Sequence, residues 1–350
     1  MFSLLTDDIV YSLQKAGGIS RYWRNLQLGL KERDVRFEAY RRSDAHGAPP
    51  IDNGQEVKSV NRHLPRNVDR YLPLQCTGST ADVFHSSYYR VPLGTDYGVV
   101  TTVHDFAYER YNTGLRALVH HKQKMKSIRS ADRVICVSRA TADDLLSFLP
   151  SASVKTEVVY HGLNPRFFGA RHADRALALP EPYVVFVGLR GGYKNFRAVA
   201  QWWRSQRRYN LMIVGGGSLS SSERSSLASN MPLLYRHAPL ATEDDLIEIY
   251  HRAHALLYPS LLEGFGMPLL EAMAAECPVV ASDIPVFREV AGDAATLVDP
   301  TPTGISGGVD QLRSVRRREE LRVAGVARAK QFSWNDTIEQ TIQVYEAIRK

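Results

Sequence analysis

Short runs of β-branched and aliphatic residues alternate along the chain with stretches whose apolar residues recur at helical spacing. The apolar runs, bounded by polar turns, predict buried strands, and the stretches between them predict amphipathic helices. Strand, helix, strand is the order of a parallel sheet with helical crossovers. After residue 98, strands are predicted over 99–105, 131–138 and 154–162, with helices ending near 129 and spanning 139–150.

The opening of the chain follows the same pattern. Residues 2–11 precede a glycine turn at Gly17 and Gly18, and a helix is predicted over 19–32. We therefore expect residues 1–168 to form one doubly wound, Rossmann-like α/β domain.

Three prolines and a loss of periodicity within residues 164–182 indicate a linker. The alternation then restarts and predicts a second Rossmann-like domain over 169–331, followed by a closing helix within 332–350 that returns to the first domain. The predicted strands of this second domain are 183–188, 210–216, 254–260 and 278–283, and the predicted helices are 195–206, 242–253 and 268–276. Two such domains facing each other would place the carboxyl ends of both sheets at one cleft, where ligands of these sheets bind.

Composition agrees with two domains, because 350 residues exceed what one hydrophobic core usually serves and 44% of them are hydrophobic. The acidic Asp7 and Asp8 interrupt the first apolar run, and no stretch approaches the roughly 18 apolar residues of a membrane span. We expect a protein that is neither secreted nor integral. The chain has three cysteines, Cys76, Cys136 and Cys277, which lie far apart in sequence. Their odd number and their spacing exclude a disulfide framework or a zinc knuckle and favour a cytoplasmic location.

The net charge of +7 is concentrated in the first half, where residues 1–170 carry 23 Lys and Arg against 17 Asp and Glu. An acidic substrate, an anionic membrane and nucleic acid are the partners that such a surplus suggests. Nucleic acid is disfavoured, because the chain has no helix-turn-helix, zinc-finger or RRM signature. The basic residues of 120–133, among them Lys122, Lys124 and Lys126, recur at near-helical spacing. They form either a solvated face or a surface for a membrane or acceptor.

The most informative segment is 259–283. A strand ends near Ser260, a glycine-rich loop turns the chain, and Pro268 opens a helix. The backbone N–H groups of the loop and helix start predict an anion site, while two carboxylates eight residues apart are suited to accept hydrogen bonds from hydroxyl groups. A ligand that is both a phosphate and a polyol fits this pattern. The residues concerned are Glu263, Gly264, Phe265, Gly266, Met267, Leu270 and Glu271.

The run E-G-F-G-M-P-L-L-E resembles the E-x7-E signature of the retaining glycosyltransferases of family 4, which have the two-domain GT-B fold. Other motifs match in the family's order. Gly17 and Gly18 resemble the glycine loop that approaches the donor, and His104 in T-V-H-D resembles the family's histidine at the donor sugar. Further matches are Ser138, His161 with Gly162, and residues 332–334.

In the second domain, the segment V-G-L-R-G-G-Y-K-N-F, which begins at Val187 and Gly188, resembles the family segment in which an arginine and a lysine grip the donor's diphosphate. Here these would be Arg190 and Lys194. Leu189 stands where many relatives have the arginine, so this sequence departs from the pattern at Arg190.

The glycines beginning at Gly215 do not form the G-x-G-x-x-G fingerprint of dinucleotide-binding domains, because Ser220 holds its sixth position. This disfavours a Rossmann oxidoreductase, and we interpret Gly215 as part of a turn that lines the nucleotide pocket. The sequence also has no D-x-D triplet to hold a metal-bridged diphosphate, so neither a metal nor a cofactor is expected.

The resemblance implies transfer of a hexosyl group, with retention, from a nucleoside diphosphate sugar to an acceptor hydroxyl. It assigns Glu271 to the ribose, Glu263 and His104 to the donor sugar, and Arg190 and Lys194 to the departing diphosphate. The N-terminal segment and the G-Y-K-N-F run resemble bacterial O-antigen and exopolysaccharide transferases. These imply a mannosyl or 6-deoxyhexosyl donor, a lipid-linked or oligosaccharide acceptor, and a place in the cytoplasm or at the inner face of the membrane. The alternatives are a GT-B sugar-nucleotide epimerase and a noncatalytic sugar-nucleotide-binding scaffold.

Overall fold

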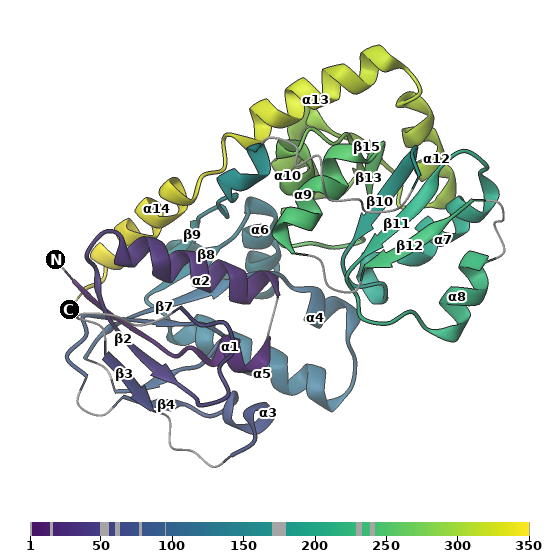
Figure 1. The fold of residues 1–350 in the computed structure, drawn as a ribbon. Helices are drawn as coiled ribbons and strands as arrows, with labels where there is room; N and C mark the ends of the chain where they lie inside the picture. The colour runs from purple at the N-terminus through teal and green to yellow at the C-terminus, as the bar shows by residue number, and fades with distance from the viewer. Residues whose placement is uncertain are drawn as a thin grey trace. The chain divides into compact units, whose positions relative to one another are not determined.

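The computed structural model describes residues 2–14, 17–49, 64–76, 79–94, 96–169, 180–228, 233–238 and 242–349, and the backbone of 56–59. The chain divides into two compact units (Figure 1). Unit 1 comprises Met1–Gly162 and Trp334–Lys350, and unit 2 comprises Leu163–Ser333. Each unit is built on a parallel sheet, as the alternating pattern of the sequence predicts.

Unit 1 contains a seven-stranded sheet in the order β3-β2-β1-β5-β7-β8-β9 and a two-stranded sheet of β4 and β6. The register pairs each strand of the larger sheet in parallel with its neighbours. The carboxyl ends of its strands therefore share one edge. The strands are β1 (Ser3–Thr6), β2 (Arg36–Arg41), β3 (Glu56–Ser59), β4 (Leu74–Gln75), β5 (Val83–Ser86), β6 (Pro92–Leu93), β7 (Gly98–Val103), β8 (Arg133–Cys136) and β9 (Thr156–Val158).

The last helix of the chain belongs to unit 1, where it runs alongside α2 (Figure 1). A Cβ at Gly29 of α2 would lie 1.9 Å from Ile338 Cδ1, so glycine permits this close approach. Tyr345 reaches the sheet, where its hydroxyl lies 2.6 Å from Nδ1 of His85. The helices of unit 1 are α1 (Ile9–Leu13), α2 (Gly18–Lys31), α3 (Arg66–Asp69), α4 (Ala107–Tyr111), α5 (Leu115–Ser130), α6 (Arg139–Phe148), α14 (Trp334–Glu346) and the 3-10 turn Pro150–Lys155.

Two adjacent carboxylates divide the opening segment into a strand and a short helix. Asp7 accepts a hydrogen bond from the Ser87 backbone at 2.7 Å, and Asp8 accepts one from Gln27 Nε2 at 2.7 Å and pairs with Arg41. Both carboxylates are buried, and these bonds tie the end of β1 to the segment after β5, to α2 and to the last residue of β2. The chain therefore leaves the sheet at Thr6 rather than continuing as a strand.

The expectation of a common face for the three lysines of α5 is wrong at Lys124. Lys122 and Lys126 are exposed, but the side chain of Lys124 is 1% exposed. Its Nζ lies 2.7 Å from Glu109 Oε2 and donates to the carbonyl oxygen of Asp105 at 2.8 Å. Residues two positions apart on an α-helix point about 200° apart, so a helix that exposes Lys122 and Lys126 turns Lys124 inward.

Unit 2 contains a six-stranded parallel sheet in the order β12-β11-β10-β13-β14-β15. Residues 170–179 of the predicted linker lie outside the described residues. The strands are β10 (Tyr183–Val187), β11 (Asn210–Val214), β12 (Tyr235–Ala238), β13 (Ala255–Tyr258), β14 (Val279–Ser282) and β15 (Thr296–Val298). The helices are α7 (Phe196–Ser205), α8 (Ser221–Ala228), α9 (Glu243–Arg252), α10 (Met267–Ala274), α11 (Pro285–Ala291), α12 (Pro302–Gln311), α13 (Val315–Ala329) and the 3-10 turns Pro165–Phe168, Gly192–Lys194 and Gly292–Ala294.

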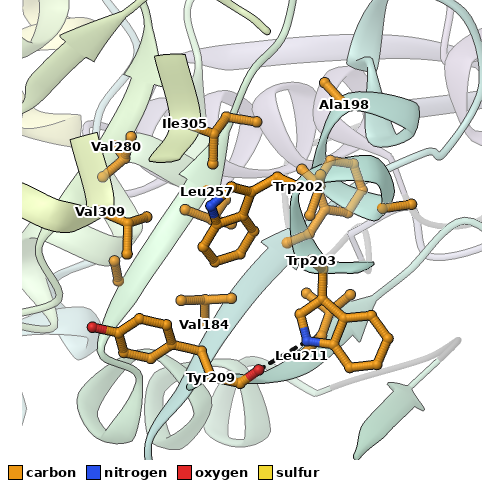
Figure 2. Close-up of a cluster of buried hydrophobic side chains, with 14 of the residues drawn as sticks. Val184, Ala198, Trp202, Trp203, Tyr209, Leu211, Leu257, Val280, Ile305 and Val309 are labelled. Carbon is orange, nitrogen blue, oxygen red and sulfur yellow. Dashed lines mark hydrogen bonds between the residues drawn. The ribbon is translucent and has the colours of Figure 1, made fainter. Parts of the chain in front are cut away.

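A large aromatic core holds α7 against the sheet of unit 2 (Figure 2). Trp202 and Trp203 are both buried among aliphatic side chains of the sheet and α12, and burying side chains of this size contributes several kcal/mol each. The indole N–H of Trp203 donates to the carbonyl oxygen of Tyr209 at 2.9 Å, so its one polar atom is satisfied. Because α7 begins two residues after Lys194, this core anchors the segment that carries that lysine.

Within the described part of the chain, no helix has both the length and the apolar character that crossing a bilayer requires.

Candidate functional site

A glycine turn links β13 to α10 and places two glutamates around the start of that helix. Gly266 precedes α10 with φ +92°, a backbone conformation that favours glycine. A Cβ at this position would also lie 2.7 Å from Cε1 of Phe287. Pro268 occupies the first turn of α10, where its missing N–H is not needed. The N–H groups at the helix start thus have the polarity that binds an anion.

Glu263 and Lys194 form an ion pair beside this turn. Lys194 Nζ lies 2.6 Å from Glu263 Oε1, and the two side chains are 16% and 9% exposed. Tyr258, at the end of β13, is buried beneath them; burial and then the charge of Glu263 raise its pKa well above the usual value. The sequence predicted both charged residues as ligand contacts, and the structure brings them together.

Hydrogen bonds hold the lysine segment against the glutamate loop. The Leu261 N–H donates to the Tyr193 carbonyl oxygen at 2.7 Å. Asn195, which has φ +55°, donates from its side-chain amide to the carbonyl oxygens of Pro259 at 3.1 Å and Pro300 at 2.8 Å. Sequence reasoning missed Asn195 because it placed this residue inside the helix predicted over 195–206, although asparagine is a typical left-handed residue.

Glu271 lies on the inward side of α10 and is 2% exposed. The hydroxyl of Tyr250, from α9, lies 3.5 Å from Glu271 Oε2. Together with Glu263 and Lys194, this carboxylate defines what we call the loop–helix site: residues Lys194, Glu263, Gly264, Phe265, Gly266, Met267, Leu270 and Glu271. At one edge of the sheet, the site presents the Lys194 cation, the carboxylates of Glu263 and Glu271 as acceptors, and the N–H groups at the start of α10.

Arg190 has different partners from Lys194. Its guanidinium is 5% exposed and pairs with Glu223 at 2.8 Å. It also donates to the carbonyl oxygens of Gly215 at 2.9 Å, Gly217 at 3.2 Å and Ser218 at 2.7 Å. Arg190 therefore holds the turn after β11, and most of its donors are already used. Glu223, which balances its charge, was not predicted; only its position in the first turn of a helix hinted at it.

The glycines of this turn allow two strand ends to approach. Gly215, Gly216 and Gly217 have φ of 86°, 78° and 69°. A Cβ at Gly216 would lie 2.5 Å from Arg190 Nη1 and 3.0 Å from the carbonyl oxygen of Gly188, which follows β10. The predicted strand-to-helix turn is present, and its shape depends on the arginine that it encloses.

In unit 1, His104 directly follows β7 and is 8% exposed. Burial, then the nearby His161, hold the pKa of His104 well below its usual value, so the ring is neutral near pH 7. No hydrogen-bond partner is found for its buried Nε2 among the described residues. A neutral histidine presents one donor and one acceptor, and this nitrogen is free to serve a ligand.

Tyr22 connects His104 to the predicted glycine loop. The Tyr22 ring packs edge-on against His104 with centroids 5.1 Å apart, and α2, which carries it, begins at Gly18. A Cβ at Gly17 would lie 2.3 Å from Oε1 of the flexible Gln14 side chain, which would have to shift, whereas the space around Gly18 is open. The structure thus places the glycine pair at the amino end of the helix that packs on the histidine.

Two of the remaining predicted positions in unit 1, Ser138 and Gly162, have a structural role. Ser138 caps α6 by accepting a hydrogen bond from the Thr141 N–H at 3.0 Å. A Cβ at Gly162 would lie 2.4 Å from Trp334, so glycine lets the chain pass the start of α14. Burial lowers the pKa of His161 to about 3.

Two family models together match most of the chain. Residues 16–167 match the model described as Glycosyltransferase Family 4, and residues 170–331 match that described as Glycosyl transferases group 1. The chain belongs to the family 4 glycosyltransferases. Its fold is GT-B, which the similar solved structures share.

Among curated relatives, the glycosyltransferase is 26% identical to the O-antigen chain mannosyltransferase B of Escherichia coli, and the match covers 98% of each chain. Sucrose-phosphate synthase of Thermosynechococcus elongatus has a similar fold, with a TM-score of 0.77 at 17% identity over 99% of both chains. HepE of Anabaena, solved in complex with UDP and glucose, gives a TM-score of 0.73 at 14% identity over 99% of this chain and 100% of its own.

Proposed function

We propose that this glycosyltransferase moves a hexosyl group, mannosyl or a related 6-deoxyhexosyl, from a nucleoside diphosphate sugar to a hydroxyl of a growing, lipid-linked bacterial surface polysaccharide. The transfer retains the anomeric configuration and needs no metal. The observation that carries the proposal is the pairing of Lys194 with Glu263 beside the amino end of α10, with Glu271 buried one turn further on. The similarity to an O-antigen mannosyltransferase supports the choice of sugar and acceptor.

The loop–helix site suits a ligand that carries both a diphosphate and hydroxyls. The Lys194 ammonium and the N–H groups at the start of α10 are donors for the diphosphate. Glu263 accepts from the donor sugar's hydroxyls and Glu271 from those of the ribose. Because Lys194 and Glu263 already lie 2.6 Å apart, the lysine shares its charge between the carboxylate and the phosphate when the donor binds.

The reaction breaks the bond between the anomeric carbon and the diphosphate oxygen and forms one to the acceptor oxygen. The acceptor's proton passes to the departing phosphate oxygen, so the chain itself need not supply a base. Negative charge grows on the diphosphate as the bond breaks, and Lys194 stabilises it at that moment. Arg190, whose donors hold the turn at Gly215, supports the pocket by shaping that turn.

His104 contributes to transfer rather than to nucleotide binding in this proposal. Its neutral ring and unpartnered Nε2 suit a hydrogen bond with a sugar hydroxyl. We expect His104→Ala to lower kcat strongly and to leave the affinity for the nucleoside diphosphate unchanged. Equal losses of both would contradict this role.

We also propose that α5 contacts an anionic membrane. Leu115, Val119, Lys122 and Lys126 follow one another at helical spacing, all are exposed, and α5 contains no acidic residue. Such an apolar and basic stripe suits an anionic lipid surface, where each lysine contributes about 1 kcal/mol. We expect Lys122→Gln/Lys126→Gln to bind phosphatidylglycerol vesicles at least tenfold more weakly. Arg116→Gln, off the stripe on the same helix, should bind them normally; equal losses refute the docking face.

Thermal unfolding with UDP, GDP, ADP and dTDP, each with and without EDTA, tests the donor site. A ligand present at 100 times its Kd stabilises the folded protein by about 2.7 kcal/mol. We expect one diphosphate to raise the Tm, with the shift unchanged by EDTA and at least tenfold weaker binding by Glu271→Gln. Glu319→Gln, an exposed glutamate of the same unit, is the matched control. No shift from any diphosphate would favour the scaffold, and isomerisation of the sugar nucleotide without acceptor would favour the epimerase.

A further inference from the structure

A cavity of about 190 Å³ opens in unit 1 between α5, residues 71–73 and residues 89–91. Residues 89–91 begin three positions after β5 ends, and His104 directly follows the neighbouring strand β7. Parallel strands end at one edge of their sheet, so the segment that walls the cavity leaves the sheet at the edge where His104 lies. The family assignment and the loop–helix site do not account for this cavity.

The wall of the cavity carries cations and no acid. Its lining includes Arg90, Lys122 and Lys126, and none of its lining side chains is a carboxylate. The charge of Arg90 is balanced by the buried Asp69, because Nη2 of Arg90 lies 3.5 Å from Oδ1 of Asp69. Nε of Arg90 donates to the carbonyl oxygen of Leu72. Its guanidinium is thereby held in place.

The two lysines are not neutralised in this way. Among the residues that the structure describes, neither Lys122 nor Lys126 has an ion-pair partner. They stand four residues apart on one face of α5, where like charges repel. A bound anion would remove this repulsion and form charge-assisted hydrogen bonds with both ammonium groups.

One uncharged polar atom at the cavity also lacks a partner. Gln123 donates from Nε2 to the carbonyl oxygen of Arg70, but its Oε1 is buried and no described residue donates to it. A buried acceptor without a donor is uncommon, and it marks a position where a ligand can donate a hydrogen bond.

The rest of the lining is apolar, from Leu72, Pro73, Val91 and Val119. Tyr89 adds an aromatic wall, and its φ of +56° is unusual for a bulky residue. The cavity thus joins a cationic side to an aliphatic side. A ligand that matches both carries an anionic group on an apolar chain.

We propose that this cavity binds the phosphate or diphosphate group that joins the acceptor saccharide to its apolar carrier. The inference rests on the proposed function for its account of the acceptor. Lys122 and Lys126 bind the anionic oxygens, Gln123 Oε1 accepts from a hydroxyl of the ligand, and the aliphatic side receives the first carbons of the chain.

Geranyl diphosphate, geraniol and inorganic pyrophosphate are suitable probes, titrated calorimetrically into the full chain without lipid. We expect the wild type to bind geranyl diphosphate, pyrophosphate more weakly, and geraniol not at all. Lys122→Gln/Lys126→Gln should raise the Kd for geranyl diphosphate at least tenfold. The control Arg116→Gln/Arg129→Gln makes the same charge change at exposed positions of α5 outside the lining, and should leave the Kd unchanged.

Three results would overturn the proposal: equal binding of geraniol and its diphosphate, equal losses in the two double variants, or the absence of binding. A fourth is loss of binding in Lys194→Ala, because the probe would then occupy the loop–helix site. Nucleoside diphosphate stabilisation reports on the proposed function separately, so the two can fail independently.

Discussion

Replacing Lys124 by methionine tests the buried charge cluster that α5 turns toward the sheet. Lys124 Nζ lies 2.7 Å from Glu109 Oε2, and the two side chains are 1% and 3% exposed. Nδ1 of His120 lies 3.5 Å from the other oxygen of Glu109. Methionine keeps an unbranched apolar stem against Phe106 and removes the charge, so that Glu109 is left buried beside a histidine.

Two arguments bear on the size of the loss. Removing one partner of a buried ion pair costs about 3–5 kcal/mol, because the other charge is left without compensation. Burial by itself raises the pKa of Glu109, but the His120 hydrogen bond and the Lys124 charge outweigh it and lower the pKa from 4.5 to about 2. A difference of this size corresponds to roughly 3 kcal/mol of stability near neutral pH, which His120 and Lys124 contribute together.

Urea unfolding of the full chain at pH 7, with amide hydrogen exchange to assign the loss to unit 1, measures the effect. We expect Lys124→Met to lose about 3–5 kcal/mol. Lys126→Met, two residues further along on the exposed face, should change the free energy of unfolding by less than about 0.5 kcal/mol. Equal effects of the two substitutions would refute the argument.

The pH dependence provides a second check on the same cluster. A carboxylate whose pKa is lowered in the folded state stabilises the protein fully above its unfolded pKa, and this contribution disappears as the pH falls through the folded pKa. For Glu109 the window runs from about pH 5 down to about pH 2. The difference between the wild type and Lys124→Met should therefore narrow in that window. A difference that stays constant there would show that lost packing, not lost charge, is responsible.

Further predictions concern the two units separately. Gly266→Ala should lower the free energy of unfolding by about 1–3 kcal/mol, because φ at this position is +92° and a Cβ would contact Phe287. The variant should also lose the stabilisation by nucleoside diphosphate. Gly307→Ala, in open space on α12, should be no less stable than the wild type. Thr242→Ala should lower the free energy of urea unfolding by about 1 kcal/mol, because it removes the cap that accepts from the Asp245 N–H; an unchanged value contradicts this. The three buried thiols should react with a disulfide reagent only after urea unfolding, because burial raises their pKa values to about 11, 12 and 12; rapid labelling of the native protein contradicts this for Cys76, Cys136 and Cys277.

The features that could be predicted from the sequence depend on local geometry. Alternating apolar runs and helical stretches predict a parallel sheet in each half of the chain, and each unit contains one. The loop–helix site could be located because Gly266 and Pro268 impose the turn and the helix start within a few residues. Glu263 and Glu271 then fall beside that start wherever the segment is placed.

The tertiary structure decided which charges meet. Three lysines of α5 look equivalent in sequence, and only the rotation of the helix against Glu109 makes Lys124 the buried one. Arg190 and Lys194 lie four residues apart, yet Glu223 and a glycine turn hold one while Glu263 holds the other. Their partners come from segments that are distant along the chain. Such pairings depend on how separate elements pack, whereas strands, turns and helix starts depend on neighbouring residues.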